Sequence, residues 1–333
     1  MIPVRWVFVL SLLAAAASLL GGCRTLQGSA AGGVVPAALV EPAVPTATAV
    51  TTDTVAAEAS AAPNQSVAAN KLAAAQLATA WNVQDYAGIG ALLDTSATID
   101  NPGLPDLHDG ESYVERAKTV HAVIPNYQLT YDDIVAEGDR VLTRETFKGK
   151  LGNTSFTYTG MLLLQLKDGK IVDVYEVSDE LAVRKFLGDI PNDQKNANFG
   201  WQGGADKPSA DSGAGDPEKN KQIVQQWWEG DAAAQGTLAA PDFAYHNPWS
   251  PEARTLADRT RIMGEIVAAF PDLTYEIEGP IIAENDKAGF RFNLAGTGLE
   301  LPGIALYRIA NGEVAEEWIV WANTTLFSAL NSN

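Results

Sequence analysis

Residues 134–144 read IVAEGDRVLTR, and residues 281–291 read IIAENDKAGFR. The two stretches carry Ile, Ala, Glu, Asp and Arg at the same places, at an offset of 147 residues (281 − 134). Further matches keep the same order on both sides, with an offset that drifts by only a few residues: Asn101-Pro102 with Asn247-Pro248, Pro125 with Pro271, Gly149 with Gly296, Gly169 with Gly312, and Tyr175 with Trp318. Because this period is far too long for a solenoid repeat, the sequence predicts a tandem duplication of one domain.

Two segments of biased composition separate the predicted domains. Residues 23–65 are rich in Ala, Pro, Thr, Val and Gly and contain no aromatic residue, and residues 188–217 end in the run PSADSGAGDP. Such segments cannot build a core and are typical of flexible connectors. We therefore expect a disordered tether at 23–65, domain 1 at 66–187, a linker at 188–217 and domain 2 at 218–333.

Each copy shows helical periodicity first and strand periodicity afterwards. Helical stripes end at Pro125 in copy one and at Pro271 in copy two, and later positions alternate between apolar and polar residues as in a strand. Asp168-Gly169 and Asn311-Gly312 lie between predicted strands and are strong hairpin signals. The sequence thus predicts an α+β fold, in which a curved antiparallel sheet wraps around N-terminal helices in a cone.

The N-terminus has the features of an export signal. Arg5 precedes the apolar run WVFVLSLLAAAASLL at 6–20, which is short for a membrane span. Leu20-Gly21-Gly22-Cys23 follows and resembles a bacterial lipobox. This resemblance implies that residues 1–22 are a signal peptide and that Cys23 is lipidated, although an uncleaved anchor or an ordinary secretory signal would give a similar pattern. We expect an exported protein, lipid-anchored to the periplasmic or extracellular face of the cell envelope.

Charge and composition exclude several classes of partner. The net charge of −18 argues against nucleic acid, because phosphate binding needs clustered Lys and Arg. Cys23 is the only cysteine, so a thiolate metal cluster is excluded, and the three histidines are too scattered for the ligand spacing of a zinc site. We expect no bound metal and contact with the membrane through the lipid anchor only.

Several motifs shared by the two copies resemble those of the SnoaL-like polyketide cyclases. In copy two these are Tyr245-His246-Asn247-Pro248, Ala269-Phe270-Pro271-Asp272-Leu273, Gly296-Thr297 and the run 312–318, GEVAEEW. Copy one shows the pattern at 99–102, 124–127, 134–141 and 168–171. The resemblance implies two tandem cone-shaped domains of the nuclear transport factor 2-like fold and cofactor-free acid–base chemistry, in which a carboxylate removes a proton next to a carbonyl and the enolate closes a ring. Such domains commonly pair through their sheets, so the two copies are also expected to form an intramolecular pseudo-dimer.

The resemblance implies a candidate base in copy one only. Family members place an Asp at the end of the strand after the hairpin Gly, a position held by Asp179 in copy one and by Ala322 in copy two. Strand alternation puts Tyr175, Val177 and Asp179 on one face, where apolar neighbours would raise the pKa of a catalytic carboxyl. The alternative is a carboxylate that caps a helix at 180–187.

Other candidate residues are divided between the copies. His246 lies at the family's His-Asp-Pro position, and Asp100 takes that place in copy one, so both are predicted to be catalytic. The second histidine typical of the family is absent from both. Substrate-binding candidates are Arg144, Tyr175, His121, Arg291 and Trp318, although the two arginines also fit strand-face ion pairs and His121 fits a buried helix residue.

Besides a structural or interaction protein that uses the fold as a scaffold, for which no residue gives specific support, two functions remain open at this stage. The first is acid–base catalysis in domain 1 on a small carbonyl compound. The second is a non-catalytic lipoprotein that binds a small apolar ligand, which the missing histidines and the exported address favour. Both predict a small apolar or carbonyl-containing ligand.

Replacement of the only cysteine tests the predicted anchor. If Cys23 is acylated, the wild-type protein will partition into detergent with the membrane fraction, because two or more acyl chains anchor a protein stably. The Cys23→Ser variant should not. Recovery of wild-type protein as a soluble chain that keeps residues 1–22 would contradict the assignment.

Overall fold

The computed structural model describes residues 63–102, 104–187, 215–248 and 254–331. The predicted signal peptide, Cys23 and nearly all of the predicted tether and linker lie outside these residues. Within the described part of the chain, no helix is both long and apolar enough to cross a membrane.

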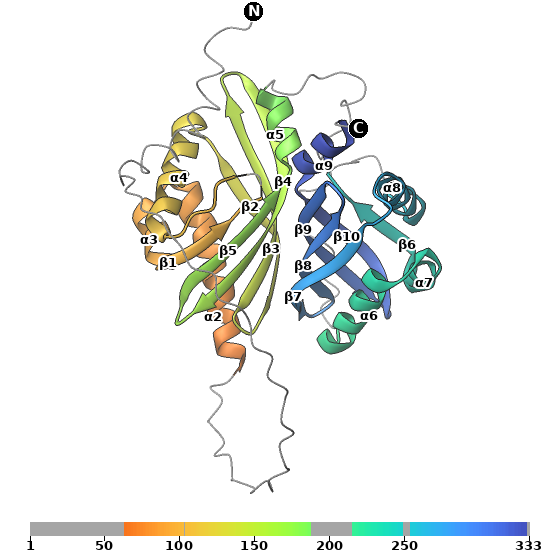
Figure 1. The fold of residues 1–333 in the computed structure, drawn as a ribbon. Coiled ribbons are helices and arrows are strands. Elements are labelled where there is room, and N and C mark those ends of the chain that lie inside the picture. Colours follow the sequence, from red (N-terminus) through yellow and green to blue (C-terminus); the bar gives the residue numbers. More distant parts are fainter. Residues whose placement is uncertain (1–62, 103, 188–214, 249–253, 332–333) are drawn as a thin grey trace, which may run out of the picture. The chain divides into compact units, whose positions relative to one another are not determined.

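The described residues form the same succession of elements twice (Figure 1). Domain 1 consists of α2 (Pro63–Asn82), α3 (Tyr86–Leu92), β1 (Leu93–Asp100), α4 (Gly110–Val123), β2 (Gln128–Glu137), β3 (Arg140–Leu151), β4 (Thr154–Lys167), β5 (Lys170–Ser178) and α5 (Glu180–Leu187). Domain 2 consists of α6 (Pro217–Glu229), α7 (Ala232–Leu238), β6 (Ala239–His246), α8 (Leu256–Ala269), β7 (Thr274–Glu284), β8 (Lys287–Gly296), β9 (Leu299–Ala310), β10 (Glu313–Trp321) and α9 (Asn323–Asn331). The two tandem α+β domains agree with the predicted fold class.

Local sequence signals explain where several elements begin and end. Asp168 and Asn311 have positive φ, as do the glycines that follow them, which is the geometry of a tight two-residue hairpin turn. The Asp109 side chain accepts a hydrogen bond from Ser112 N and so caps the start of α4. Thr255 and Asp258 form a capping box at the matching start of α8.

One strand in each domain departs from the antiparallel meander. The sheets have the orders β1-β5-β4-β3-β2 and β6-β10-β9-β8-β7, and the consecutive strands β2–β5 and β7–β10 pair antiparallel as predicted. However, β1 lies between two helices in the chain and pairs parallel with β5, as β6 does with β10. The sheets are therefore mixed, because a helix and three strands separate the parallel partners and supply the crossover that parallel pairing requires.

Alternation along the strands divides each sheet into two buried faces. In domain 1 the face covered by α2, α3 and α4 carries Val141, Phe147 and Val174, which belong to one apolar cluster with the helices. The opposite face carries Leu142 and Tyr175, which belong to a second cluster. We call the helix-covered side of the sheet the interior of its domain.

The second cluster joins the two sheets to each other. It combines side chains of both domains: Val135, Leu142, Met161, Leu163, Tyr175, Val177, Ile282, Ile304, Leu306, Trp318 and Val320. The described residues of both domains accordingly belong to one compact unit. The apolar faces that the strands turn away from the helices are thus removed from water, which stabilises both sheets.

The polar contacts between the sheets are reciprocal. Ala283 N donates to the Glu137 carboxylate at 2.9 Å, and Ala136 N donates to the Glu284 carboxylate at 3.0 Å. Lys221 and Lys71 complete the pattern by pairing with the same two carboxylates. Corresponding residues of the two copies therefore exchange the same contacts, as expected of a two-fold arrangement.

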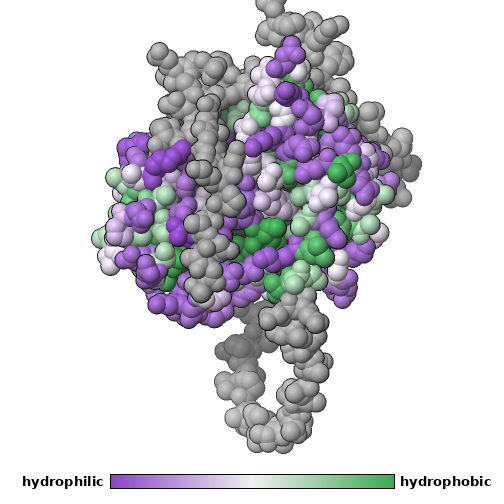
Figure 2. All heavy atoms as spheres, turned by 180° about the vertical axis from the view of Figure 1, so that it is seen from behind, coloured by the Kyte–Doolittle hydropathy of each residue, from purple (hydrophilic) through white to green (hydrophobic). Residues whose placement is uncertain are grey.

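Large apolar side chains are exposed only singly among the described residues. The exposed ones are Leu72, Val83, Leu104, Val267 and Tyr275. Figure 2 shows one face of the molecule, on which hydrophilic residues surround small hydrophobic areas. Single exposed apolar side chains are normal for a soluble surface.

Candidate functional site

Three of the predicted site residues meet where the sheets contact each other. The Arg291 guanidinium lies 3.6 Å from the centre of the Tyr175 ring, and its Nη2 lies 3.6 Å from Asp100 Oδ2. Arg291 Nε also pairs with Glu278. The strand-face ion pair that the sequence left open for this arginine is therefore present, combined with a contact to the other domain.

Arg144, Trp318 and His246, which correspond to Arg291, Tyr175 and Asp100, form a matching group on the other side of the contact between the sheets. The Arg144 guanidinium lies 4.9 Å from the centre of the Trp318 ring, and the His246 ring is stacked on the same tryptophan at 5.1 Å. His246 Nε2 lies 3.4 Å from Glu316 Oε2. The small cavity beside these side chains has a volume of about 10 Å³, too little for a substrate. Arg144 itself is buried and pairs with Asp133 at 2.7 Å.

Asp179 lies at the start of α5 and is completely buried. Its Oδ1 accepts hydrogen bonds from Ala182 N at 3.1 Å and from Asn323 Nδ2, in domain 2, at 2.7 Å. Tyr175 and Val177 belong to the apolar cluster between the two sheets. The strand face on which Asp179 was predicted with them is therefore the face turned away from the helices. These are the contacts of the helix cap that the sequence left open as the alternative, and they give no support to a role as base.

The interior of domain 1 contains two other carboxyl groups. Glu145 on β3 lies on the same strand face as Thr143 and Phe147, and Glu176 on β5 lies on the same face as Val174. Phe147 and Val174 belong to the interior cluster. Burial raises the pKa of Glu145 well above its ordinary value, and the nearby Glu176 raises it further. Burial also raises the pKa of Glu176. We call these two residues the carboxyl pair.

The two members of the pair have unequal surroundings. The Arg116 guanidinium and a hydrogen bond with Asn101 favour the ionised form of Glu176 and partly offset the effect of burial on its pKa. Glu145 receives one hydrogen bond, from Thr143 Oγ1 at 3.0 Å, and among the described residues no cation lowers its pKa. Glu145 therefore keeps its proton to higher pH, and Glu176 is the member that ionises first.

Four tyrosines surround the carboxyl pair. Burial raises the pKa of each, and the charges of Glu145 and Glu176 raise it further: Tyr113, Tyr127, Tyr131 and Tyr158. Tyr131 lies directly across the β2–β3 ladder from Glu145, and its buried hydroxyl has no hydrogen-bond partner among the described residues. These hydroxyls stay neutral near pH 7 and can donate hydrogen bonds to a ligand oxygen.

His121 lies in an aromatic part of the same interior. It is 4% exposed, and its ring lies 5.3 Å from that of Trp81 and 5.8 Å from that of Tyr86. Burial lowers its pKa, so the imidazole is neutral near pH 7. His121 thus forms part of the interior wall together with the aromatic rings.

The interior of domain 2 lacks the carboxyl pair. The offsets of the repeat place Phe292 at the position of Glu145 (292 − 145 = 147) and Ile319 at that of Glu176 (319 − 176 = 143). Instead, Arg259 pairs with the buried Glu317 and lies 5.0 Å from the centre of the Trp227 ring. This ion pair is satisfied within the protein, which is typical of a structural core.

Comparison with known families decides what these two domains are. A family model described as "SnoaL-like domain" matches residues 74–174 and 221–317, which together are more than half of the chain. The chain belongs to the SnoaL-like domain family. No curated protein matches the sequence.

Solved structures resemble single SnoaL-like domains of this chain. An LEH-like epoxide hydrolase from M. tuberculosis is 18% identical, with 37% of this chain and 92% of that chain covered, at a TM-score of 0.34. Wild-type IdmH from Streptomyces antibioticus is 26% identical, with 36% of this chain and 98% of that chain covered, at a TM-score of 0.34. A protein of ketosteroid isomerase-like fold from Catenulispora acidiphila DSM 44928, in complex with trimethylamine, is 19% identical. The match covers 36% of this chain and 93% of that chain, at a TM-score of 0.33.

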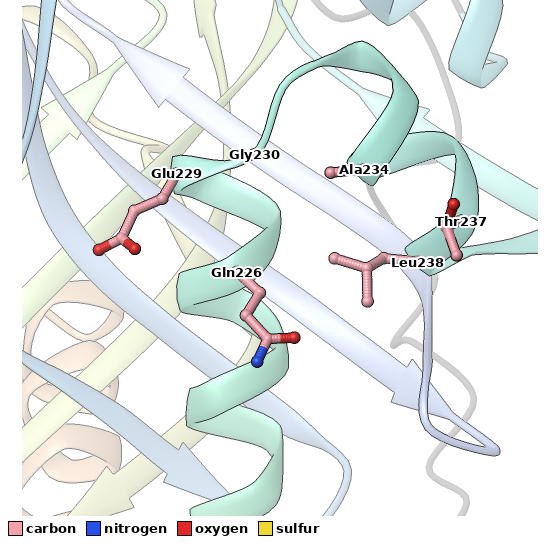
Figure 3. Close-up of a pocket in the computed structure, with 6 residues that line it drawn as sticks. All are labelled: Gln226, Glu229, Gly230, Ala234, Thr237 and Leu238. Carbon is pink, nitrogen blue, oxygen red and sulfur yellow. The ribbon is translucent and has the colours of Figure 1, made fainter.

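A surface pocket of about 480 Å³ lies between α6 and α7 of the second SnoaL-like domain (Figure 3). Glu229 is the only ionisable residue in its lining, and its carboxylate points away from Ala234, Thr237 and Leu238. The described residues also contain no group of three or more side chains that could hold a metal ion. The carboxyl pair in the first SnoaL-like domain is therefore the strongest candidate for chemistry.

Sequence reasoning missed the carboxyl pair, although a signal for it exists. Glu145 is in phase with Val141 and Phe147, and Glu176 is in phase with Val174. An acidic residue on an otherwise apolar strand face is unusual because an unpaired buried charge is costly. Phe292 and Ile319 show that the other SnoaL-like domain has apolar residues at the same two positions.

The raised pKa of Glu145 predicts how stability changes with pH. The folded protein holds a proton that the unfolded chain releases above about pH 4.5, so this stabilisation is complete below that pH and is lost as pH rises through the raised pKa. We expect the free energy of unfolding, measured with urea, to fall less between about pH 5 and pH 8 in Glu145→Gln than in the wild type. The exposed Glu300→Gln is the control. Parallel pH curves for the wild type and Glu145→Gln would contradict the expectation.

Proposed function

We propose that the first SnoaL-like domain performs cofactor-free acid–base chemistry on a small carbonyl compound, using Glu176 as the base and Glu145 as the acid. The observation that carries this proposal is the pair formed by the buried Glu145 and the half-buried Glu176, which have raised pKa values and unequal surroundings. Two titratable groups whose environments separate their proton affinities are the usual arrangement for paired acid and base roles.

In this mechanism the proton moves between named atoms. The Glu176 carboxylate takes a proton from the carbon next to the substrate carbonyl, while the Glu145 carboxyl donates its proton to the carbonyl oxygen. The product is an enol, which can attack a second carbonyl of the same molecule and close a ring, while Glu145 takes back the enol proton and Glu176 gives its proton to the new alkoxide. The Tyr131 hydroxyl can donate a hydrogen bond to the same oxygen as negative charge develops there.

Arg116 and Asn101 have a supporting role in this proposal. Both favour the ionised form of Glu176, so they keep a fraction of the base ready at neutral pH in spite of its burial. The rate should therefore rise with pH through the ionisation of Glu176 and fall at higher pH as Glu145 loses its proton, with two apparent pKa values that belong to the pair.

A second candidate is binding without catalysis. The observation that favours it is the interior of the second SnoaL-like domain, where Phe292 and Ile319 leave an apolar wall and the Arg259–Glu317 pair is already satisfied. On this alternative the chain is a small-molecule-binding lipoprotein, and the carboxyl pair of the first domain only orients its ligand.

The place of action is part of the proposal. We infer that the protein is exported and held at the cell envelope by a lipid on Cys23, on the support of the apolar run and the lipobox-like residues before this cysteine. The Cys23→Ser partition experiment is the test. The ligand would then be a compound that reaches the periplasmic or extracellular face.

We also propose that the two domains form an intramolecular pseudo-dimer in solution, which the reciprocal contacts of Glu137 and Glu284 support. Limited proteolysis should cut within 188–217, because such segments are open to proteases, and the two fragments should still elute together at the size of the intact protein. Elution as two separate fragments would argue against the pseudo-dimer.

Hydrogen–deuterium exchange at the α-carbon of a bound 1,3-dicarbonyl compound tests the chemistry without knowledge of the natural substrate. We expect Glu176→Gln to slow this exchange by about 10²- to 10⁴-fold, the usual contribution of a positioned general base, and to change the affinity little.

The Asp179→Asn variant separates the two candidate bases. Because Asn keeps the cap of α5, the exchange rate should stay close to that of the wild type. A large loss in Asp179→Asn with none in Glu176→Gln would restore Asp179 as the base. If the wild type binds the compound and gives no exchange above buffer, the binding function is the better account.

A further inference from the structure

The start of α9 in the second domain touches the carboxyl-rich end of β5 in the first. Asn323 Oδ1 accepts a hydrogen bond from Leu181 N at 3.2 Å, and its amide donates to Asp179 at 2.7 Å. Next to it, Thr324 Oγ1 donates to Glu180 Oε2 at 2.9 Å. Asn323 is completely buried and Thr324 is 8% exposed, so water does not compete freely for these bonds.

Glu180 connects this contact with the carboxyl pair. It lies four residues beyond Glu176, just after the strand ends, and its negative charge acts on Glu176 to raise that residue's pKa. Burial raises the pKa of Glu180 itself, whereas the hydrogen bond from Thr324 and the charge of Arg184 favour its ionised form. The hydroxyl of Thr324 thus stabilises a charge that Glu176 experiences.

We propose that the second SnoaL-like domain controls the protonation of the carboxyl pair in the first, through the hydrogen bond from Thr324 to Glu180. In this proposal Thr324 is a positioning residue that acts through Glu180 and never touches the substrate. The consequence for turnover rests on the proposed function, while the effect on protonation does not.

The direction of the effect follows from electrostatics. An ionised Glu180 makes the negative form of Glu176 less favourable, so Glu176 holds its proton to higher pH. Loss of the Thr324 hydroxyl leaves Glu180 less able to ionise, and over part of the pH range its charge then disappears. Glu176 should in consequence ionise at lower pH.

Other groups near Glu176 set the background against which this effect is measured. Arg116 on α4 and Asn101 after β1 favour its ionised form, and Glu145 on β3 titrates with it as a pair. None of these residues contacts Thr324, so they are unchanged in the variants below.

Titration of the side-chain carboxyls by carbon-13 NMR, in the full-length chain labelled at glutamate, measures the effect directly. The Glu176 signal is assigned by its loss in Glu176→Gln. We expect Glu180→Gln to lower the midpoint of Glu176 by roughly half a unit to one unit, the size expected for removal of one charge at several ångströms in a partly buried site. Thr324→Val, which has nearly the same shape as the wild-type residue, should lower it by a smaller amount.

A double-variant cycle distinguishes this effect from a general loosening of the structure. In the Glu180→Gln background, Thr324→Val should produce no further shift, because the charge through which it acts is already absent. Thr324→Ser, which keeps the hydroxyl, should titrate like the wild type, and Thr325→Val on the same helix is the matched control.

Three results would overturn the proposal. They are an unshifted midpoint in Glu180→Gln, an upward shift in Thr324→Val, and an equal shift for Thr324→Val in both backgrounds. Because the titration requires no turnover, a protein that shows these shifts but no α-carbon exchange would keep this inference and lose the proposed function. Exchange without the shifts would do the reverse.

Discussion

Both faces of every sheet in this protein are covered. One face lies under the helices of its own domain, and the other packs against the sheet of the second domain. A charged side chain that these strands bury has little access to water and must find a partner, lose its charge or shift its pKa. Arg144 and Arg291 satisfy this constraint with carboxylates and aromatic rings, whereas burial raises the pKa values of Glu145 and Glu176.

Sequence patterns predicted the parts of the structure that depend on near neighbours. The turn at Asp168-Gly169 and the end of α4 before Pro125 follow from the conformations that these residues allow, and repeated motifs reveal the duplication without any structure. The parallel pairing of β1 with β5 was beyond such reasoning, since it joins strands about seventy residues apart whose sequences carry no signal for each other.

In the candidate site, too, sequence patterns predicted what depends on near neighbours and missed what depends on distant parts of the chain. Alternation correctly grouped Tyr175 with Val177, but it could not tell which face of the strand the helices cover. That choice depends on how the sheet curves and on what packs against its other side. Asp179 was predicted from the family's strand-end position, whereas Glu176, three residues earlier, lies on the face that the helices cover. The same argument applies to Arg144, whose aromatic neighbour Trp318 belongs to the other copy and could not be inferred from copy one alone.

The reciprocal contacts between the two halves have a consequence for how the protein can change. In a dimer of identical chains, every substitution appears on both sides of the two-fold axis, so a gain at one site is tied to any harm at the other. Here the halves are encoded separately within one chain. Position 292 carries Phe where the matching position 145 carries Glu, whereas Glu137 and Glu284, which join the sheets, are the same in both halves. Covalent fusion thereby lets the two halves carry different residues at matching positions, which mutation cannot achieve in a symmetric pair of identical chains.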